Sequence, residues 1–126
     1  MKRLLLDTHV LLWWMEDPAL LSPGAIEAIR APDAVRLFSV AAAWEMLIKS
    51  ASGRLEVPGD LERVLAADFM LPLDITMRHA ARAAALPPHH GDPFDRMMVA
   101  QAMEENLTLV TRDGRMTAYE VATLLA

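Results

Sequence analysis

The chain has 126 residues, a length that suits a single compact domain spanning residues 1–126. It contains no cysteine, which excludes disulfide scaffolds, thiol catalysis and cysteine-ligated zinc. The formal net charge of −5 argues weakly against a broad basic surface for nucleic acid, although acids grouped around a bound cation distort such a whole-chain count.

The first half of the chain predicts two strands, each followed by a helix. The apolar run Lys2–Leu6 suits a buried strand, and a helix is expected over Thr8–Glu16, before Asp17-Pro18. Ser22-Pro23 has the form of a helix start, a capping serine followed by proline, and predicts a helix to about Arg30. A second strand is expected over Val35–Val40, followed by a helix from Ala41 to about Ser52.

The second half of the chain continues this alternation. The expected elements are a helix from Gly59-Asp60 to about Ala67, a strand over Met70–Ile75, a helix capped by Thr76, a helix opening at Asp92-Pro93 and a strand over Leu107–Thr111. The tail, Tyr119–Leu125, is ambiguous between strand and helix. Alternating strands and helices predict an α/β fold with a central parallel sheet of four to five strands and helices on both faces.

The N-terminal run "MKRLLLDTHVLLWWM" has a basic start and an apolar stretch, as a signal peptide would. Asp7-Thr8-His9 interrupts the stretch, and no small-residue cleavage site follows. No segment approaches the roughly 18 uninterrupted apolar residues of a membrane span. We therefore expect a cytoplasmic protein without membrane association.

Three acidic residues lie at strand ends or on a helix that follows a strand. Asp7 follows the first strand, where it either caps the next helix or binds a ligand. Glu45 lies beside the apolar face of its helix, and either points inward or pairs with Lys49 four residues later. Asp113 follows the fourth strand, in an Asp-Gly pair that is also typical of a tight turn.

Two further acids stand three residues apart in "HHGDPFDRMMVAQA". Asp92 precedes a proline and has the form of a helix cap, which explains it fully. Asp95 then falls one turn into the helix, on the same face as Val99 and Ala102. We expect that face to pack on the sheet, which directs Asp95 toward the edge where the other acids lie.

Carboxylates gathered at one sheet edge repel one another unless a cation holds them together. An all-oxygen set favours Mg²⁺ or Mn²⁺, one or two ions, whereas zinc prefers histidine or cysteine. Such a site activates water and clamps a phosphate. The pattern therefore predicts a metal site formed by Asp7, Glu45, Asp95 and Asp113.

Five successive segments resemble the PIN (PilT N-terminal) domains, and most of all the VapC-like toxins of bacterial toxin–antitoxin pairs. The segments are "LLLDTHVLLWW", "SVAAAWEMLIKSASGRL", "LPLDITMRHA", "HHGDPFDRMMVAQA" and "LTLVTRDGRMTAYEV". The resemblance implies a Mg²⁺- or Mn²⁺-dependent endoribonuclease whose acidic quartet matches Asp7, Glu45, Asp95 and Asp113. It also implies that Thr8 and Thr111 support the site.

The same resemblance implies partners: an RNA substrate, a small cognate antitoxin protein and a second copy of the chain in a homodimer. Trp13 and Trp14 either belong to the antitoxin surface or lie in the core, and we favour the core for at least one. Alternatives are a PIN nuclease of RNA processing, a HAD-like phosphatase and a non-catalytic interaction module. The phosphatase requires a D-x-D after the first strand, and "DTH" lacks the second acid.

The remaining polar candidates have ordinary explanations. Arg96 and Arg112 each adjoin a quartet acid and are the candidate contacts to substrate phosphate, with surface ion pairs as the alternative. His89-His90 is a poor zinc spacing and predicts solvent-facing or structural histidines. His9 and His79 stand alone and are also expected to be structural.

Overall fold

The computed structural model describes residues 2–126 and contains one parallel sheet with strand order β3-β2-β1-β4-β5. The strands are β1 (Arg3–Leu6), β2 (Val35–Ser39), β3 (Met70–Leu73), β4 (Thr108–Thr111) and β5 (Thr123–Leu125). The predicted parallel sheet is confirmed, and the ambiguous tail supplies its fifth strand. β3 is an edge strand, which accommodates Pro72 because an edge position can do without one ladder N–H.

Helices connect these strands where the sequence predicts them. They are α1 (Thr8–Glu16), α2 (Pro23–Arg30), α3 (Val40–Ala51), α4 (Leu61–Ala67), α5 (Met77–Ala85) and α6 (Pro93–Glu105), with short 3₁₀ turns η1 (Pro18–Leu20) and η2 (Gly114–Ala118). β2 ends one residue earlier than predicted, because the Ser39 side chain accepts the amide of Ala41 and caps α3. β3 stops at Leu73 rather than Ile75, and Thr76 caps α5 with His79 completing a capping box.

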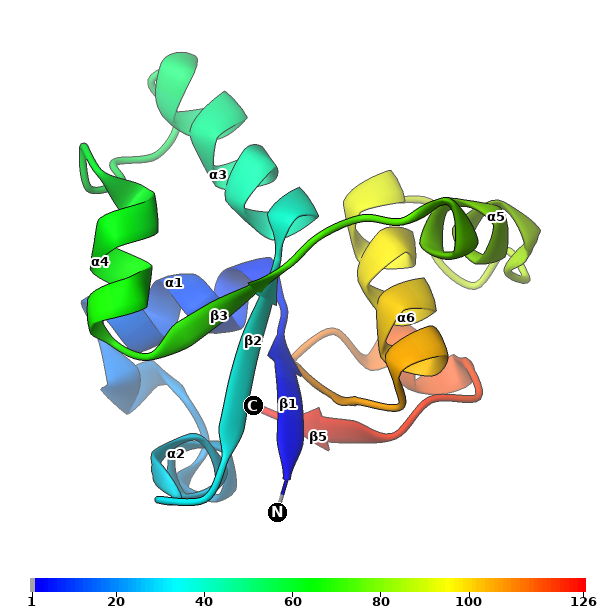
Figure 1. The fold of residues 1–126 in the computed structure, drawn as a ribbon, viewed down its shortest axis with the longest axis horizontal. Coiled ribbons are helices and arrows are strands. Elements are labelled where there is room, and N and C mark those ends of the chain that lie inside the picture. Colours follow the sequence, from blue (N-terminus) through cyan, green and yellow to red (C-terminus); the bar gives the residue numbers. More distant parts are fainter. Residues whose placement is uncertain (1) are drawn as a thin grey trace.

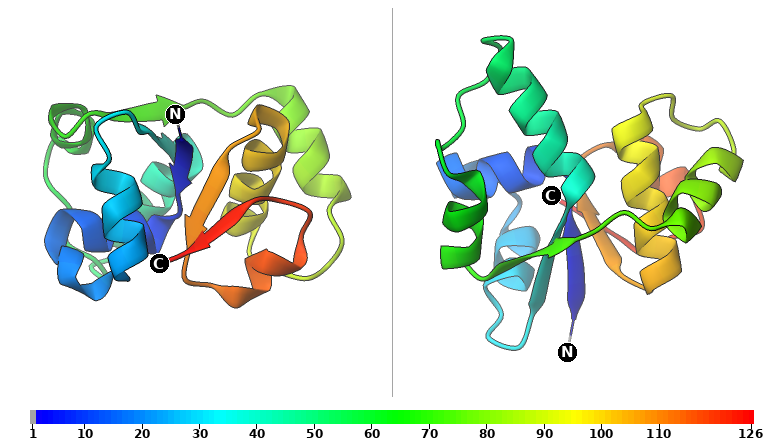
Figure 2. Two further views of the ribbon diagram at one scale, coloured as in Figure 1. Left: turned by 90° about the horizontal axis from the view of Figure 1, so that it is seen from below. Right: turned by 45° about the horizontal axis from the view of Figure 1, so that its top comes forward.

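Helices cover both faces of the sheet (Figure 2), and buried apolar side chains form one core layer on each face. Along β1, Leu4 and Leu6 pack into the layer that includes α1, α2 and α4, whereas Leu5 packs into the layer built on α6. This alternation follows from the period of two along a strand. β1 is central in the sheet and buried on both faces, which explains its unbroken leucine run.

The carboxyl edge of the sheet is where helices from the two layers meet (Figure 1). Helix α3 begins directly after β2 and contacts both α1 and α6. Ala42 of α3 joins one core layer and Met46 joins the other. The starts of α1, α3 and α6 therefore surround the end of β1. Within residues 2–126, no helix has the length and apolar character needed to cross a membrane.

Candidate functional site

Asp7 follows β1 directly and serves as the N-cap of α1. Its Oδ1 accepts a hydrogen bond of 2.9 Å from the amide of Val10, and the residue is only 4% exposed. Burial raises the pKa of the Asp7 carboxyl, and hydrogen bonds from Thr111 and the Val10 amide oppose that rise. The cap predicted for this residue is thus present, in a position where the charge is costly.

Glu45, in the second turn of α3, combines the two arrangements predicted for it. It is 8% exposed, and its Oε1 accepts a 2.7 Å hydrogen bond from the Thr8 hydroxyl. Its Oε2 accepts from the Lys49 ammonium at 3.0 Å. The carboxylate therefore points inward and is paired at the same time, which is how a buried charge is normally tolerated. Thr8 makes the contact expected of a supporting residue.

The two acids at the start of α6 have different surroundings. Asp92 caps the helix, since its Oδ1 accepts from the amides of Phe94 and Asp95. Burial raises the pKa of Asp95 to about 7, and the charge of Asp92 adds to the rise. His90 opposes it, while Asp7 and Glu45 raise the pKa further. Three other acids are thus close enough to repel the Asp95 charge.

Asp113, two residues beyond β4, caps η2 and is held by the neighbouring chain. Its amide donates to the Thr111 hydroxyl at 3.0 Å, and its Oδ1 accepts from the Arg115 amide at 3.0 Å. The Arg115 guanidinium donates to both carboxylate oxygens, at 3.1 and 2.9 Å. These bonds from Arg115 hold the pKa of Asp113 well below its usual range. Arg115, not singled out in the sequence, is a surface residue that faces the site.

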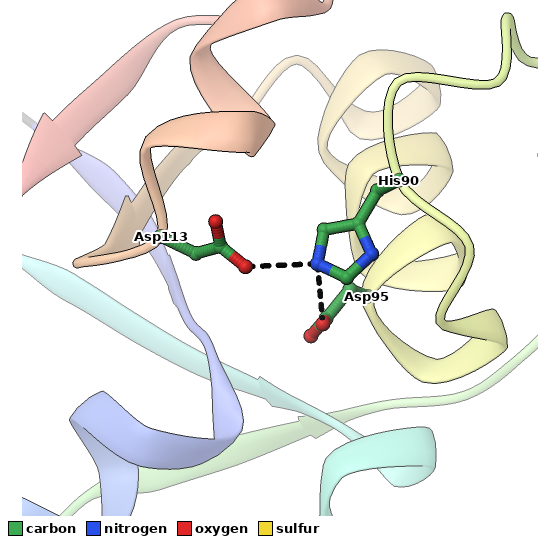
Figure 3. A group of neighbouring side chains, drawn as sticks. All are labelled: His90, Asp95 and Asp113. Atoms are coloured by element: carbon green, nitrogen blue, oxygen red, sulfur yellow. Dashed lines mark hydrogen bonds and ion pairs between the residues drawn. The ribbon is translucent and has the colours of Figure 1, made fainter.

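His90 is the site residue that sequence reasoning missed. Of the two alternatives predicted for this histidine, solvent-facing or structural, the first is wrong, because His90 is 5% exposed; its ring reaches the acidic cluster. Its Nε2 lies 2.8 Å from Asp113 Oδ2 and 3.0 Å from Asp95 Oδ2, between the two carboxylates (Figure 3). The contact with Asp113 spans 23 residues of sequence, so no local pattern reveals it. Its neighbour His89 is exposed, as predicted.

Arg96 is engaged with backbone carbonyls rather than directed at the site. Its two terminal nitrogens donate to the carbonyl oxygens of Ala83, Leu86, Pro87 and His90, which fixes the turn between α5 and α6. Arg112 similarly donates to the carbonyls of Ala126 and Leu20, and its guanidinium lies 4.4 Å from the Trp13 ring centroid. Both guanidinium groups are thus engaged with backbone carbonyls, and these contacts do not support the predicted substrate contacts.

The lone histidines and the tryptophans are explained by packing. His79 is buried, and its ring accepts the Thr76 amide in the capping box of α5, as a structural histidine should. His9 is exposed and stacks obliquely on Trp13. Trp13 and Trp14 are partly buried against the core, and Trp14 donates its indole N–H to Asp68 at 2.7 Å.

The assembled side chains suit a divalent cation. One oxygen each of Asp95 and Asp113 and one ring nitrogen of His90 lie within 4.8 Å of one another, and the charges of Asp7 and Glu45 act on Asp95 from nearby. Carboxylate oxygens are the ligands that Mg²⁺ and Mn²⁺ prefer. Burial is the main cause of the raised pKa of Asp95, and the charges of Asp92, Asp7 and Glu45 add to the rise. A bound cation would relieve that repulsion.

A family model for the PIN domain matches residues 4–122. The chain belongs to the PIN domain family. It is 34% identical over 123 residues to Ribonuclease VapC22 of Mycobacterium tuberculosis, covering 94% of this chain and 93% of that protein.

Solved structures share the PIN fold of this chain at low sequence identity. VapBC2 from Rickettsia felis, bound to a DNA fragment from its promoter, matches with a TM-score of 0.73 and 12% identity over 98% of each chain. A toxin–antitoxin complex from Klebsiella pneumoniae matches with a TM-score of 0.67 and 21% identity, over 95% of this chain and 94% of that one. At these identities the likeness concerns the fold.

Proposed function

We propose that this PIN domain is a metal-dependent endoribonuclease, the toxin of a toxin–antitoxin pair, that hydrolyses RNA phosphodiester bonds. The observation that carries the proposal is the convergence of four acids from separate elements on one sheet edge, where burial and mutual repulsion raise the pKa of Asp95 to about 7. Buried acids with shifted pKa values are concentrated at functional sites, where a cation or a substrate interacts with the charge. The relationship to Ribonuclease VapC22 supports RNA as the substrate.

Asp7, Glu45, Asp95 and Asp113 are the proposed ligands for one or two Mg²⁺ or Mn²⁺ ions. When bound, such an ion lowers the pKa of a water molecule and stabilises negative charge on a phosphate. The protein itself fixes the orientation of the proposed ligand carboxylates. The Thr8 hydroxyl and the Lys49 ammonium fix the two oxygens of Glu45.

Thr111 links two of the proposed ligands. Its hydroxyl oxygen accepts from the Asp113 amide, and its hydrogen bond to Asp7 opposes the rise of that pKa. Arg115 binds Asp113 from the exposed side, where it is also placed to meet an incoming phosphate. We propose Thr8 and Thr111 as supporting residues and Arg115, instead of Arg96 and Arg112, as the arginine nearest to substrate.

A small antitoxin protein, together with a second copy of the chain, is the proposed protein partner. Solved structures that share the fold include a toxin–antitoxin complex from Klebsiella pneumoniae and DNA-bound VapBC from Salmonella typhimurium. Exposed apolar side chains on this chain offer surface for such partners: Trp44, Leu47, Phe69, Leu71 and Met77. The proposed compartment is the cytoplasm, where an intracellular RNA target would be met.

Induced expression tests this proposal in one experiment. Wild type and Asp95→Asn are expressed at matched levels, growth is followed, and newly formed RNA 5′ ends are sequenced. We expect growth arrest and new 5′-phosphate ends with wild type and neither with the variant. Arrest with equal RNA cleavage by both proteins would contradict the proposed site, and arrest without RNA cleavage by either would contradict the proposed substrate.

A further inference from the structure

His90 is held at both its backbone and its ring. Its amide donates to the Tyr119 hydroxyl oxygen at 2.9 Å, and its carbonyl accepts from Arg96 at 3.2 Å. Tyr119 in turn donates to the carbonyl of Pro87 at 2.9 Å. The backbone of His90 is therefore anchored to α6 and to the residue that follows η2, and this anchoring sets the point from which the ring reaches the two acids.

The contact made by Nδ1 assigns the proton on the imidazole ring. The backbone amide of Asp92 donates to His90 Nδ1 at 3.0 Å, so this nitrogen presents its lone pair. A neutral imidazole with an accepting Nδ1 carries its hydrogen on Nε2. Nε2 is then a donor, which fits its two neighbours, the Oδ2 atoms of Asp95 and Asp113 at 3.0 and 2.8 Å.

A metal ligand needs the opposite arrangement. To bind a cation, Nε2 must present its lone pair, and a neutral ring would then carry hydrogen on Nδ1, facing the N–H of Asp92. The Nδ1–H of His90 and the N–H of Asp92 would then face each other as two donors, and the hydrogen bond between these nitrogens would be lost. His90 lies within the compact group of candidate ligand atoms, yet its surroundings select it as a donor to the carboxylates.

We propose that His90 is a positioning residue of the metal site: its Nε2–H bridges Asp95 and Asp113 and orients both carboxylates for the cation without binding the cation itself. The proposal rests on the proposed function for the metal site. It extends that function to a residue outside the four acids. Outer partners of this kind change metal affinity by about 10–100-fold when they are removed.

The tautomer can be tested without any metal. In protein labelled with ¹⁵N at histidine and kept in EDTA, long-range ¹H–¹⁵N spectra distinguish a protonated Nε2 from a protonated Nδ1. We expect a hydrogen on Nε2 of His90 and none on Nδ1, which accepts the Asp92 amide. A hydrogen on Nδ1 instead would overturn the proposal, whether or not the protein cleaves RNA.

Direct coordination can be tested on the wild-type protein loaded with Mn²⁺. Pulsed EPR detects the coupling of Mn²⁺ to a directly bound imidazole nitrogen. We expect bound Mn²⁺ without any coupling to a directly bound imidazole nitrogen, because His90 is the histidine that lies among the candidate ligand atoms. A coupling of that kind would make His90 a ligand and overturn the proposal.

Substitutions at His90 separate the donor from the bulk of the side chain. In His90→Gln the amide nitrogen reaches about as far as Nε2, whereas in His90→Asn it reaches only as far as Nδ1. We expect calorimetric Mn²⁺ affinity to fall by about 10–100-fold in His90→Asn and to recover largely in His90→Gln. His89→Asn is the matched control, because His89 is exposed and its ring contacts Tyr119 edge-on, and we expect its affinity to be unchanged.

The outcomes distinguish this inference from the proposed function. Unchanged or higher affinity in His90→Asn, with normal folding by circular dichroism, would overturn the positioning role while the four acids remain the metal site. Absence of any carboxylate-dependent Mn²⁺ binding in the wild type would instead overturn the metal site, and the positioning role with it. If His90→Asn does not fold, the histidine ¹⁵N spectrum and the Mn²⁺ EPR spectrum of the wild type still test the proposal.

Discussion

The starts of α1 and α6 each provide a helix cap and a carboxylate that faces the site, but they do so with different numbers of residues. Each helix begins with an aspartate cap at the carboxyl edge of the sheet and presents a carboxylate to the site. At α1 a single residue, Asp7, accepts the Val10 amide and also faces the other acids. At α6 the two tasks are divided, because Asp92 accepts the amides while Asp95, one turn in, faces the site.

The difference teaches that an acid at a helix start cannot be assigned a role from its position alone. Capping explains Asp92 completely, and it also explains part of Asp7. Asp92 and Asp7 differ in the surroundings of the carboxylate beyond the capped amides. The pKa of Asp7 is raised by burial, a cost that capping alone does not require. Substitutions that keep the helix cap and remove the negative charge can therefore test this comparison.

The largest effect is expected from Asp7→Asn. Asparagine caps a helix about as well as aspartate, so this change removes the charge and keeps the α1 cap. We expect RNA cleavage with Mn²⁺ to fall by more than about 100-fold, beyond what loss of an outer partner costs. Urea unfolding in EDTA should show an unchanged or higher free energy of unfolding. Retained cleavage would mean that Asp7 is only a cap.

Arg96→Met tests how firmly the start of α6 is held. The guanidinium donates to four carbonyls, whereas the same helix position in α1 is the buried Leu11. We expect the free energy of unfolding to fall by about 2–4 kcal/mol, because hydrogen bonds from a charged group are among the stronger ones. The control is Arg63→Met, which loses only an exposed ion pair with Asp60. Equal small losses in both would contradict the structural role of Arg96.

The fold and the acids could be predicted because their signals are local. Caps such as Ser22, Thr76 and Asp92 lie within three residues of the amides they accept, and short apolar runs mark the strands. Parallel strands then bring Asp7 and Asp113 to one edge without further information. Glu45 was left open between two arrangements, and the structure shows both.

His90 and the arginines could not be predicted because their contacts are not local. The ring of His90 meets Asp113 across 23 residues, and Arg112 meets Leu20 across 92. Adjacency to a quartet acid in sequence suggested Arg96 and Arg112 for substrate, yet the chain turns both toward carbonyls elsewhere. Only tertiary packing decides where a long side chain is used.

The pH dependence of the free energy of unfolding tests whether the pKa of Asp95 is raised in the folded protein. The Asp95 pKa of about 7 lies above its unfolded value, so the folded state binds more protons than the unfolded state between about pH 4 and 7. In EDTA we expect the free energy of unfolding to rise as pH falls from 7 to 5, by about 1–2 kcal/mol after solvent screening. Asp95→Asn should flatten that rise, as measured by urea unfolding at each pH. An equally steep rise in the variant would contradict the assignment.

The smallest effect is expected from Asp92→Asn. Asparagine retains the cap, so the free energy of unfolding should fall by about 1 kcal/mol or less. Because the charge of Asp92 helps to raise the pKa of Asp95, that pKa should move down in the variant. Carboxyl ¹³C spectra recorded against pH in EDTA would measure it. An unmoved Asp95 pKa would show that the charge of Asp92 does not contribute to the rise.

The most direct measurement compares RNA cleavage by purified Asp95→Asn and Asp92→Asn, at saturating Mn²⁺ and equal folded concentration. The two carboxylates are three residues apart at the start of the same helix, so comparing the two variants separates the effect of a site carboxylate from the effect of the helix cap. We predict that Asp95→Asn loses more than about 100-fold in rate while remaining folded, and that Asp92→Asn stays close to wild type. Full cleavage by folded Asp95→Asn would contradict the account.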